Sequence, residues 1–148
     1  MKHKGFTLIE LLVSMGIIAV LTGMAVFNFN QSRMRARDVQ RKSDVSQLQK
    51  AMELYKNDNR TYPADTNFQT TLIDGGYTKV TFNDPKGAEW YTYRYLPALD
   101  LRTYYLVACL ENNGDSTKAT SAQCSDAELD GCMCGDSSTG VSYILSNP

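Results

Sequence analysis

The chain has 148 residues, with 15 basic and 16 acidic side chains and a formal net charge of -1 at pH 7. This length fits a single domain, and the balanced charge argues against a protein that binds nucleic acid through a basic surface. The sequence has a single histidine, His3, and contains neither a glycine-rich phosphate loop nor a Gly-x-Ser-x-Gly motif. We therefore expect a protein that is not an enzyme and uses no cofactor.

An almost unbroken apolar run of 24 residues begins at Phe6 and reads FTLIELLVSMGIIAVLTGMAVFNF. As a helix that rises about 1.5 Å per residue, the run is long enough to cross a hydrocarbon core of about 30 Å. Its one formal charge is Glu10. Because a carboxylate in the middle of a span costs roughly 2.5 to 3.5 kcal/mol, Glu10 needs a cationic partner, and the run contains none.

A short basic head, MKHKG, precedes the apolar run and ends in Gly5. If the chain were cut after Gly5, the new α-amino group of Phe6 would be a cation at the start of the apolar helix. The amine of one chain could then pair with Glu10 of another chain. Methylation of the amine would keep its positive charge.

The residues K-G followed by F-T-L-I-E-L-L resemble the processing site of type IV pilins and of the related type II secretion pseudopilins. The resemblance is dense from Lys4 to Tyr62. It implies that an aspartic peptidase of the membrane, the prepilin peptidase, cuts between Gly5 and Phe6 and methylates Phe6, and that Glu10 is the assembly residue. Residues 1–5 would be the cleaved leader, residues 6–29 the transmembrane and filament-core half of a long helix, and residues 30–148 the rest of this helix with a globular head.

The resemblance implies a structural subunit of a type IV pilus, a single-pass precursor in the cytoplasmic membrane that becomes part of an extracellular filament. Its expected partners are further copies of itself in a helical homopolymer, the prepilin peptidase, the cytoplasmic membrane, and an assembly platform with its ATPase. We expect no nucleic-acid partner. Two alternatives stay open, a pseudopilin of a type II secretion pseudopilus and a single-span membrane-anchored binding domain. A signal peptide fits poorly, because its apolar stretch is shorter and a small-residue cleavage site follows it.

The helical pattern continues beyond the apolar run. No glycine or proline occurs from Gln31 to Asn57, and an apolar stripe recurs there at helical spacing, formed by Val45, Leu48, Met52 and Tyr55. We predict one helix from about Phe6 to Lys56 that is transmembrane in its first half and amphipathic in its second. The stripe is predicted to dock the head of the same chain.

Basic residues crowd the start of the amphipathic half, namely Arg33, Arg35, Arg37, Arg41 and Lys42. We predict that they form a solvated helix face beside anionic lipid headgroups. The alternative is a basic stripe that meets acidic residues on neighbouring subunits of a filament.

The remainder of the chain predicts an α+β fold with a small C-terminal antiparallel sheet. The segment Asp58 to Pro63 should end the long helix, and Phe68 to Asp74 should form a short helix. Tyrosines alternate with other residues from Tyr91 to Tyr95, and Thr103 to Leu110 has the composition of a buried strand. We predict that these two runs pair as a hairpin packed on the long helix, with Val141 to Leu145 as a third strand.

Four cysteines lie late in the chain, at Cys109, Cys124, Cys132 and Cys134. In an exported chain an even number of cysteines indicates disulfides, and four cysteines allow three connectivities. Cys132 and Cys134 are too close for an easy mutual bridge. We favour Cys109 with Cys134 and Cys124 with Cys132, a pairing that would hold the loop between Asn112 and Gly140 against the sheet.

Metal binding is the rival use of this region. A zinc site built from the four cysteines would usually show two Cys-x2-Cys knuckles, and the chain has only one Cys-x-Cys. A calcium site could draw oxygen ligands from Asp126, Glu128, Asp130 and Asp136, but no twelve-residue calcium loop with its glycine is present. We therefore predict no metal.

Overall fold

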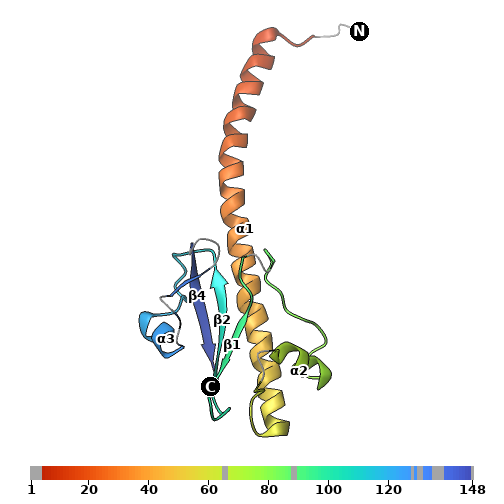
Figure 1. Cartoon of the computed structure of the whole chain (residues 1–148). Coiled ribbons are helices and arrows are strands. Elements are labelled where there is room, and N and C mark those ends of the chain that lie inside the picture. The colour runs from red at the N-terminus through yellow and green to blue at the C-terminus, as the bar shows by residue number, and fades with distance from the viewer. Residues whose placement is uncertain are drawn as a thin grey trace. The chain divides into compact units, whose positions relative to one another are not determined.

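The computed structural model describes residues 5–64, 67–87, 90–127, 129, 132–134 and 139–147, without the side chains of residues 25–28. The chain divides into two compact units, the first ending at Met34 and the second beginning at Arg35. One long helix, α1 (Leu8–Asn59), runs through both units (Figure 1). The predicted continuous helix is therefore confirmed, with both ends a few residues later than expected.

The first unit consists of the N-terminal part of α1 and the residues before it. Helix α1 contains a window apolar and long enough to cross a membrane, and none of that window is buried inside the chain. Large apolar side chains such as Leu12 and Ile18 are more than half exposed there. This surface has to be covered by lipid or by other protein, since no part of its own unit covers it.

Helix α1 ends in the second unit with a left-handed residue. Arg60 has φ 66°, and its backbone N–H donates to the carbonyl oxygen of Lys56 at 2.7 Å. A left-handed residue just after the last helical turn is a common way to stop an α-helix. The chain then runs through Tyr62, whose N–H donates to the carbonyl oxygen of Leu101 at 2.9 Å. The predicted stop between Asp58 and Pro63 is confirmed.

A four-stranded antiparallel sheet forms the centre of the second unit, with strand order β1-β2-β4-β3. Its strands are β1 (Arg94–Pro97), β2 (Tyr104–Leu110), β3 (Met133–Cys134) and β4 (Gly140–Ser146). The predicted hairpin and third strand are confirmed, although β1 begins at Arg94 rather than at Tyr91. Strand β3 was not predicted, because two residues are too few to show a period of two.

One face of the sheet packs on α1, as predicted. The side chains of Tyr104, Leu106 and Ala108 on β2 share a buried cluster with the helix residues Val45, Leu48, Ala51 and Met52. Helix α2 (Phe68–Asp74) has the predicted bounds and adds Phe68 and Leu72 to the same cluster. Because side chains alternate along a strand, every second residue of β2 faces this layer.

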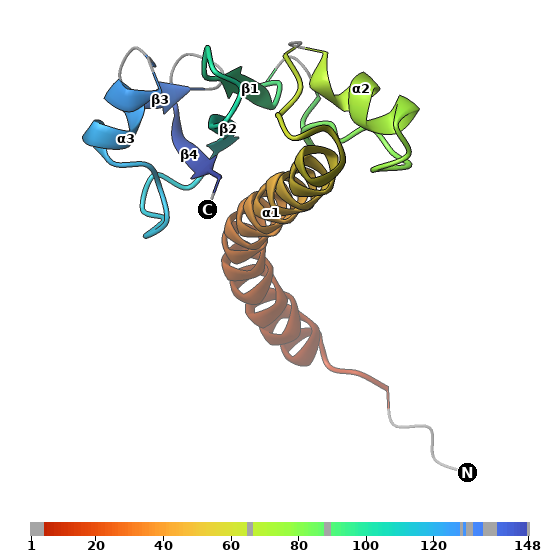
Figure 2. The same cartoon turned by 90° about the horizontal axis from the view of Figure 1, so that it is seen from below.

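The opposite face of the sheet carries a second, smaller layer (Figure 2). Val107 and Ile144 pack there with Ala119, Cys124 and Ala127, around the short helix α3 (Ser121–Asp126). A capping box starts α3, in which Thr120 accepts from the N–H of Gln123 and the Gln123 side chain accepts from the N–H of Thr120. This helix was not predicted, since its six residues carry no apolar stripe.

Gly140 is required where β4 passes the Cys109–Cys134 pair. A β-carbon added at Gly140 would lie 2.5 Å from Cys109 Sγ and 2.7 Å from the carbonyl oxygen of Leu110. The second of these is a backbone atom of the last residue of β2, which cannot move without disturbing the end of the ladder between β2 and β4. Only glycine fits this position.

We expect Gly140→Ala to destabilise the head by about 1 to 3 kcal/mol, the usual cost of overpacking a tight site. Denaturant unfolding of the oxidised, detergent-solubilised chain measures this change. Gly114→Ala is the matched control, because its added methyl would meet only Asn112 Oδ1 at 3.4 Å. Equal stability of the two variants would contradict the steric argument.

Candidate assembly site

The start of α1 holds the Glu10 carboxylate in a capping box. The backbone N–H of Thr7 donates to Glu10 Oε2 at 2.8 Å, and the Thr7 hydroxyl donates to the same oxygen at 2.6 Å. In return, the N–H of Glu10 lies 3.4 Å from Thr7 Oγ1. The pattern Thr-x-x-Glu at residues 7–10 is the sequence signal for this arrangement, and our sequence reasoning overlooked it.

The capping box supplies Glu10 with hydrogen bonds but with no counter-charge. Both bonds from Thr7 end on Oε2, and among the described residues Oε1 accepts none. Hydrogen bonds from neutral donors satisfy a carboxylate less well than an ionised donor does. A lone chain therefore presents a partly satisfied acid on an exposed apolar helix.

The proposed cleavage point lies one residue before this box. Phe6 is 90% exposed, and a β-carbon built at Gly5 would meet no atom within 4 Å. Nothing described in the chain shields the bond between the two residues. The leader residues 1–4, which include His3, lie outside the described residues.

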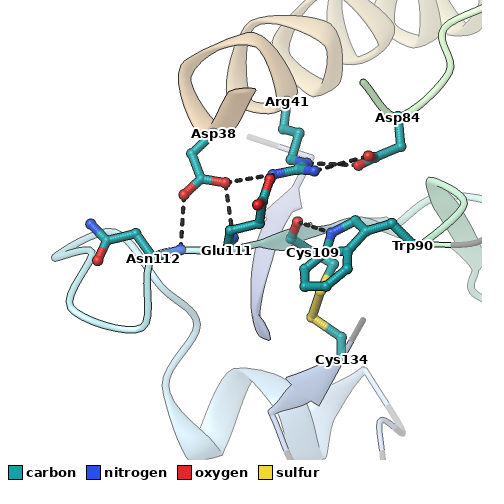
Figure 3. Close-up of a disulfide and its surroundings, with 8 residues drawn as sticks. All are labelled: Asp38, Arg41, Asp84, Trp90, Cys109, Glu111, Asn112 and Cys134. Atoms are coloured by element: carbon teal, nitrogen blue, oxygen red, sulfur yellow. Dashed lines mark hydrogen bonds and ion pairs between the residues drawn. A yellow bond between two sulfur atoms is a disulfide. The ribbon is translucent and has the colours of Figure 1, made fainter. Parts of the chain in front are cut away.

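The basic residues after the apolar run behave differently from the prediction. Arg41 is completely buried, and its guanidinium bonds three carboxylates of its own chain (Figure 3). Nε and Nη2 donate to Asp84 at 2.7 and 2.9 Å, and Nη1, which carries two hydrogens, donates to Asp38 and to Glu111, each at 2.7 Å. The prediction of a solvated face is wrong for Arg41, and so is the alternative of an intersubunit stripe.

The position of Arg41 on the helix explains this error. Arg41 precedes Val45 by four residues, so both side chains lie on the face of α1 that the sheet covers. The buried face of α1 is therefore apolar from Val45 onward and charged before it, at Asp38 and Arg41. This spacing was visible in the sequence, but two of the three acidic partners, Asp84 and Glu111, are 43 and 70 residues away in the chain and could not be paired by inspection.

Arg37 and Lys42 also pair within the chain. Arg37 binds Glu111 with two parallel hydrogen bonds of 2.7 Å, and Lys42 Nζ lies 2.6 Å from Asp115. Burial alone would raise the pKa of Glu111, but the hydrogen bonds from Arg37 and Arg41 outweigh it and lower the pKa to about 2. Glu111 therefore stays ionised, and α1 is tied to the end of β2 by charge as well as by apolar packing.

Asp38 completes this attachment through the backbone. Its carboxylate accepts the N–H groups of Glu111 and Asn112, both at 2.9 Å (Figure 3). These donors belong to the residues just after β2, where the strand ladder no longer supplies acceptors. The helix side chain thereby satisfies the open end of the strand.

Arg33 and Arg35 keep the predicted exposed character. Among the described residues no carboxylate pairs with either side chain, and Arg33 lies over the Phe29 ring at 4.3 Å from its centre. These two cations are the part of the basic cluster that remains available to lipid headgroups or to other protein.

All four cysteines form disulfides, Cys109 with Cys134 and Cys124 with Cys132. This is the pairing favoured from the sequence. The bonded Cα atoms are 5.8 and 5.6 Å apart, which lies in the ordinary range for a disulfide. Because no cysteine is free, the zinc alternative has no thiolates to use. Trp90 packs on Cys109 and Cys134 and donates its indole N–H to the Cys109 carbonyl oxygen at 3.3 Å.

The calcium alternative falls largely outside the described residues. Asp126 ends α3, whereas Glu128, Asp130 and Asp136 are not described. Within the described part of the chain, no group of three or more histidine, cysteine, aspartate or glutamate residues could hold a metal ion.

Comparisons with known proteins agree on the N-terminal segment and extend beyond it. A family model described as the prokaryotic N-terminal methylation motif matches residues 1–26. Type II secretion system core protein G of Aeromonas hydrophila is 30% identical over 99 residues, which cover 58% of this chain and 69% of that protein. The chain belongs to the type IV pilin and pseudopilin family.

Members of both branches of this family are similar to the chain. Core protein G of Vibrio cholerae is 29% identical over 133 residues, which cover 80% of this chain and 89% of that protein. The type IV wide pilus major component PilA4 of Thermus thermophilus is 38% identical over 80 residues, which cover 54% of this chain and 59% of that protein. No solved structure gives a significant match.

We expect Arg41→Met to destabilise the head of this pilin-family protein by about 3 to 5 kcal/mol, because Asp84 is left buried without its cation. Arg35→Met is the matched control and should change the free energy of unfolding by less than about 0.5 kcal/mol, since Arg35 is exposed. Guanidinium denaturation of both variants in detergent, with the disulfides intact, provides the measurement. A small effect at Arg41 would show that the buried ion pairs do not hold α1 to the head.

Proposed function

We propose that the chain is a structural subunit of a type IV pilus, made as a membrane precursor and polymerised through α1. The observation that carries this proposal is the partly satisfied Glu10 carboxylate, placed at the start of an exposed apolar helix and close to the Gly5–Phe6 bond. In a monomer the capping box leaves Glu10 without a counter-charge, whereas a polymer can supply one.

Processing would create the missing cation. The prepilin peptidase hydrolyses the bond between Gly5 and Phe6, releases the leader, and methylates the new amine of Phe6. The methylated amine remains positively charged and still has N–H groups to donate. It stands at the same end of the helix as Glu10, so that subunits stacked side by side bring one chain's amine to another chain's carboxylate.

Assembly would then exchange lipid for protein around α1. Lipid tails are as apolar as the helix surface, so helix packing in the membrane gains little from hydrophobicity and depends on close fit and polar contacts. The pairing of an ammonium group with Glu10 supplies the polar contact in a medium of low dielectric constant. The cytoplasmic membrane, an assembly platform and its ATPase are the proposed partners in this step.

The head is built to survive outside the cytoplasm. Two disulfides and the ion pairs of Arg37, Arg41 and Lys42 fasten the sheet and its loops to the second half of α1. Because the head is attached to α1 in this way, a force applied to the helix during assembly would not detach the head. This supports a role in a fibre.

A pseudopilin of a type II secretion pseudopilus is the second candidate. It is favoured by the match to core protein G of Vibrio cholerae, which extends over 80% of this chain. The two candidates differ in where the fibre ends, so immunogold electron microscopy of whole cells distinguishes them. Labelled fibres beyond the cell surface at native expression support the pilus, and label confined to the periplasm supports the pseudopilus.

We expect the mature protein to begin at Phe6 and to carry one methyl group on its α-amine. Intact-mass measurement and sequencing of the N-terminal peptide from purified filaments test both modifications together. Gly5→Trp should block the cut, because a bulky side chain replaces the smallest one at the scissile bond. A membrane-anchored binding domain predicts an unmodified N-terminus, and finding one would overturn the proposed processing.

We expect Glu10→Ala to leave cleavage and membrane insertion intact but to reduce the filament yield more than tenfold. Each contact would leave a buried ammonium group without its partner, which costs about 3 to 5 kcal/mol. The measurement is the amount of processed subunit in sheared filaments relative to the amount in membranes. Asp74→Ala is the control, since it removes an exposed acid from the head. Normal yield from Glu10→Ala would refute the pairing.

A further inference from the structure

The surface of α1 beside Glu10 is hollowed. A depression of about 300 Å³ is lined by Ile9, Glu10, Val13, Ser14 and Ile17. It lies in the groove between two helical ridges, one formed by Ile9, Val13 and Ile17 and the other by Glu10 and Ser14, each at a spacing of four residues. The side chain of Ser14 is much smaller than that of Glu10 on the same ridge. The groove is therefore widest beside Ser14.

The hollow is apolar apart from the carboxylate at one end. The Ser14 hydroxyl donates to the carbonyl oxygen of Leu11 at 2.9 Å, so its polar hydrogen is already used within the helix. The other walls are aliphatic side chains. A suitable occupant therefore combines a positive charge at one end with a compact apolar group directly attached to it.

We propose that this hollow receives the Phe6 ring of a second copy of the chain, so that the ring and the amine of one residue dock together. This inference rests on the proposed function, in which the Phe6 amine pairs with Glu10. In the processed chain the ammonium group and the benzyl group of Phe6 share one α-carbon. Ser14 makes the room for the ring and is a positioning residue for assembly.

The dimensions of the site fit this occupant. Glu10 and Ser14 are separated by about 6 Å along the helix axis, a distance that one phenylalanine spans from its amine to its ring. The groove is open on one side rather than enclosed, so a ring would lie in it against the aliphatic side chains of α1. Lysine and arginine fit less well, because their charge lies at the end of a flexible chain rather than beside a rigid ring.

The hollow also explains how an apolar contact can be specific in a membrane. In the precursor, lipid acyl chains cover the groove, and they are as apolar as a phenylalanine ring. Selection must then come from packing and from the linked charge pair. A ring seated between the Ile9 ridge and Ser14 places its amine at Glu10, whereas a lipid chain brings no cation.

Filling the hollow tests the proposal. We expect Ser14→Leu to be cleaved, methylated and inserted normally, but to lower the filament yield on the order of tenfold, because the added side chain occupies the place of the ring. Thr22→Leu is the matched control. It makes the same kind of polar-to-leucine change on α1, about two turns beyond Ser14 and outside the hollow, and should keep the yield within about twofold of the parent chain.

A partner substitution distinguishes a filled hollow from a general defect. Phe6→Ala removes the ring, so adding it to Ser14→Leu should raise the yield above that of Ser14→Leu alone, with processing of Phe6→Ala verified by intact mass. This non-additivity is the signature of direct contact. Normal yield from Ser14→Leu, a loss at Thr22→Leu equal to that at Ser14→Leu, or additive effects of the two changes would overturn the inference.

The result is separable from the proposed function. If Glu10→Ala stops polymerisation while Ser14→Leu does not, the pairing of the Phe6 amine with Glu10 is supported and the docking of the Phe6 ring beside Ser14 is refuted. If neither change affects the filaments, both are wrong. Photo-crosslinking from p-azidophenylalanine at position 6, which keeps the docking ring and leaves the hollow empty, provides independent support, since the cross-linked peptide should contain residues 9–17 of another subunit. A cross-link to lipid alone in purified filaments would contradict the proposal.

Discussion

A carboxylate on an apolar helix must be satisfied by some donor, and Glu10 has one set of donors inside the chain and, in the filament that we propose, a stronger one on a neighbouring chain. Thr7 supplies two hydrogen bonds from neutral groups to a single oxygen of the carboxylate. This is enough to let the precursor wait in the membrane without unfolding its first turn. In the filament that we propose, a neighbouring ammonium group would add the charge that Thr7 lacks, so the subunit would be tolerated alone and favoured in the polymer.

Arg41, the buried charge in the head, differs from Glu10 because its counter-charges lie in the same chain. Arg41 is fully buried, yet it binds Asp38, Asp84 and Glu111 in its own chain, and no described polar side-chain atom in the interior lacks a partner. A charge that is satisfied internally costs little to keep buried and is expensive to separate. It therefore fastens the head to the second half of α1. The same helix thus carries Arg41, whose charge is paired within the chain, and Glu10, whose charge we propose to be paired by another chain.

The sequence revealed those parts of the fold that repeat a local pattern. The long helix, α2 and the hairpin between β1 and β2 follow from helical stripes and strand alternation, and Gly5, Phe6 and Glu10 indicate the N-terminal methylation motif that the family model matches over residues 1–26. Helix α3 and strand β3 are too short to show a period. Arg41 was misassigned because its burial depends on Asp84 and Glu111, which only the folded chain brings near. The capping box of Thr7 and Glu10 is indicated by the pattern Thr-x-x-Glu, but from the sequence we considered only the charge of Glu10.

The disulfides lie where the apolar core is thinnest. The layer on the α3 face of the sheet contributes mostly small side chains, such as Ala119, Cys124 and Ala127, whereas the layer on the α1 face contains leucine, methionine and several aromatic rings. Small side chains bury little apolar area, so this layer gains little from packing. Closing loops with sequence separations of 25 and 8 residues contributes about 3.5 and about 2.5 kcal/mol by constraining the unfolded chain. Because such bonds persist mainly in an oxidising compartment, the proposed location of the head outside the cytoplasm would give the α3 layer its full stability there. The first half of α1, which holds no cysteine, does not depend on this step.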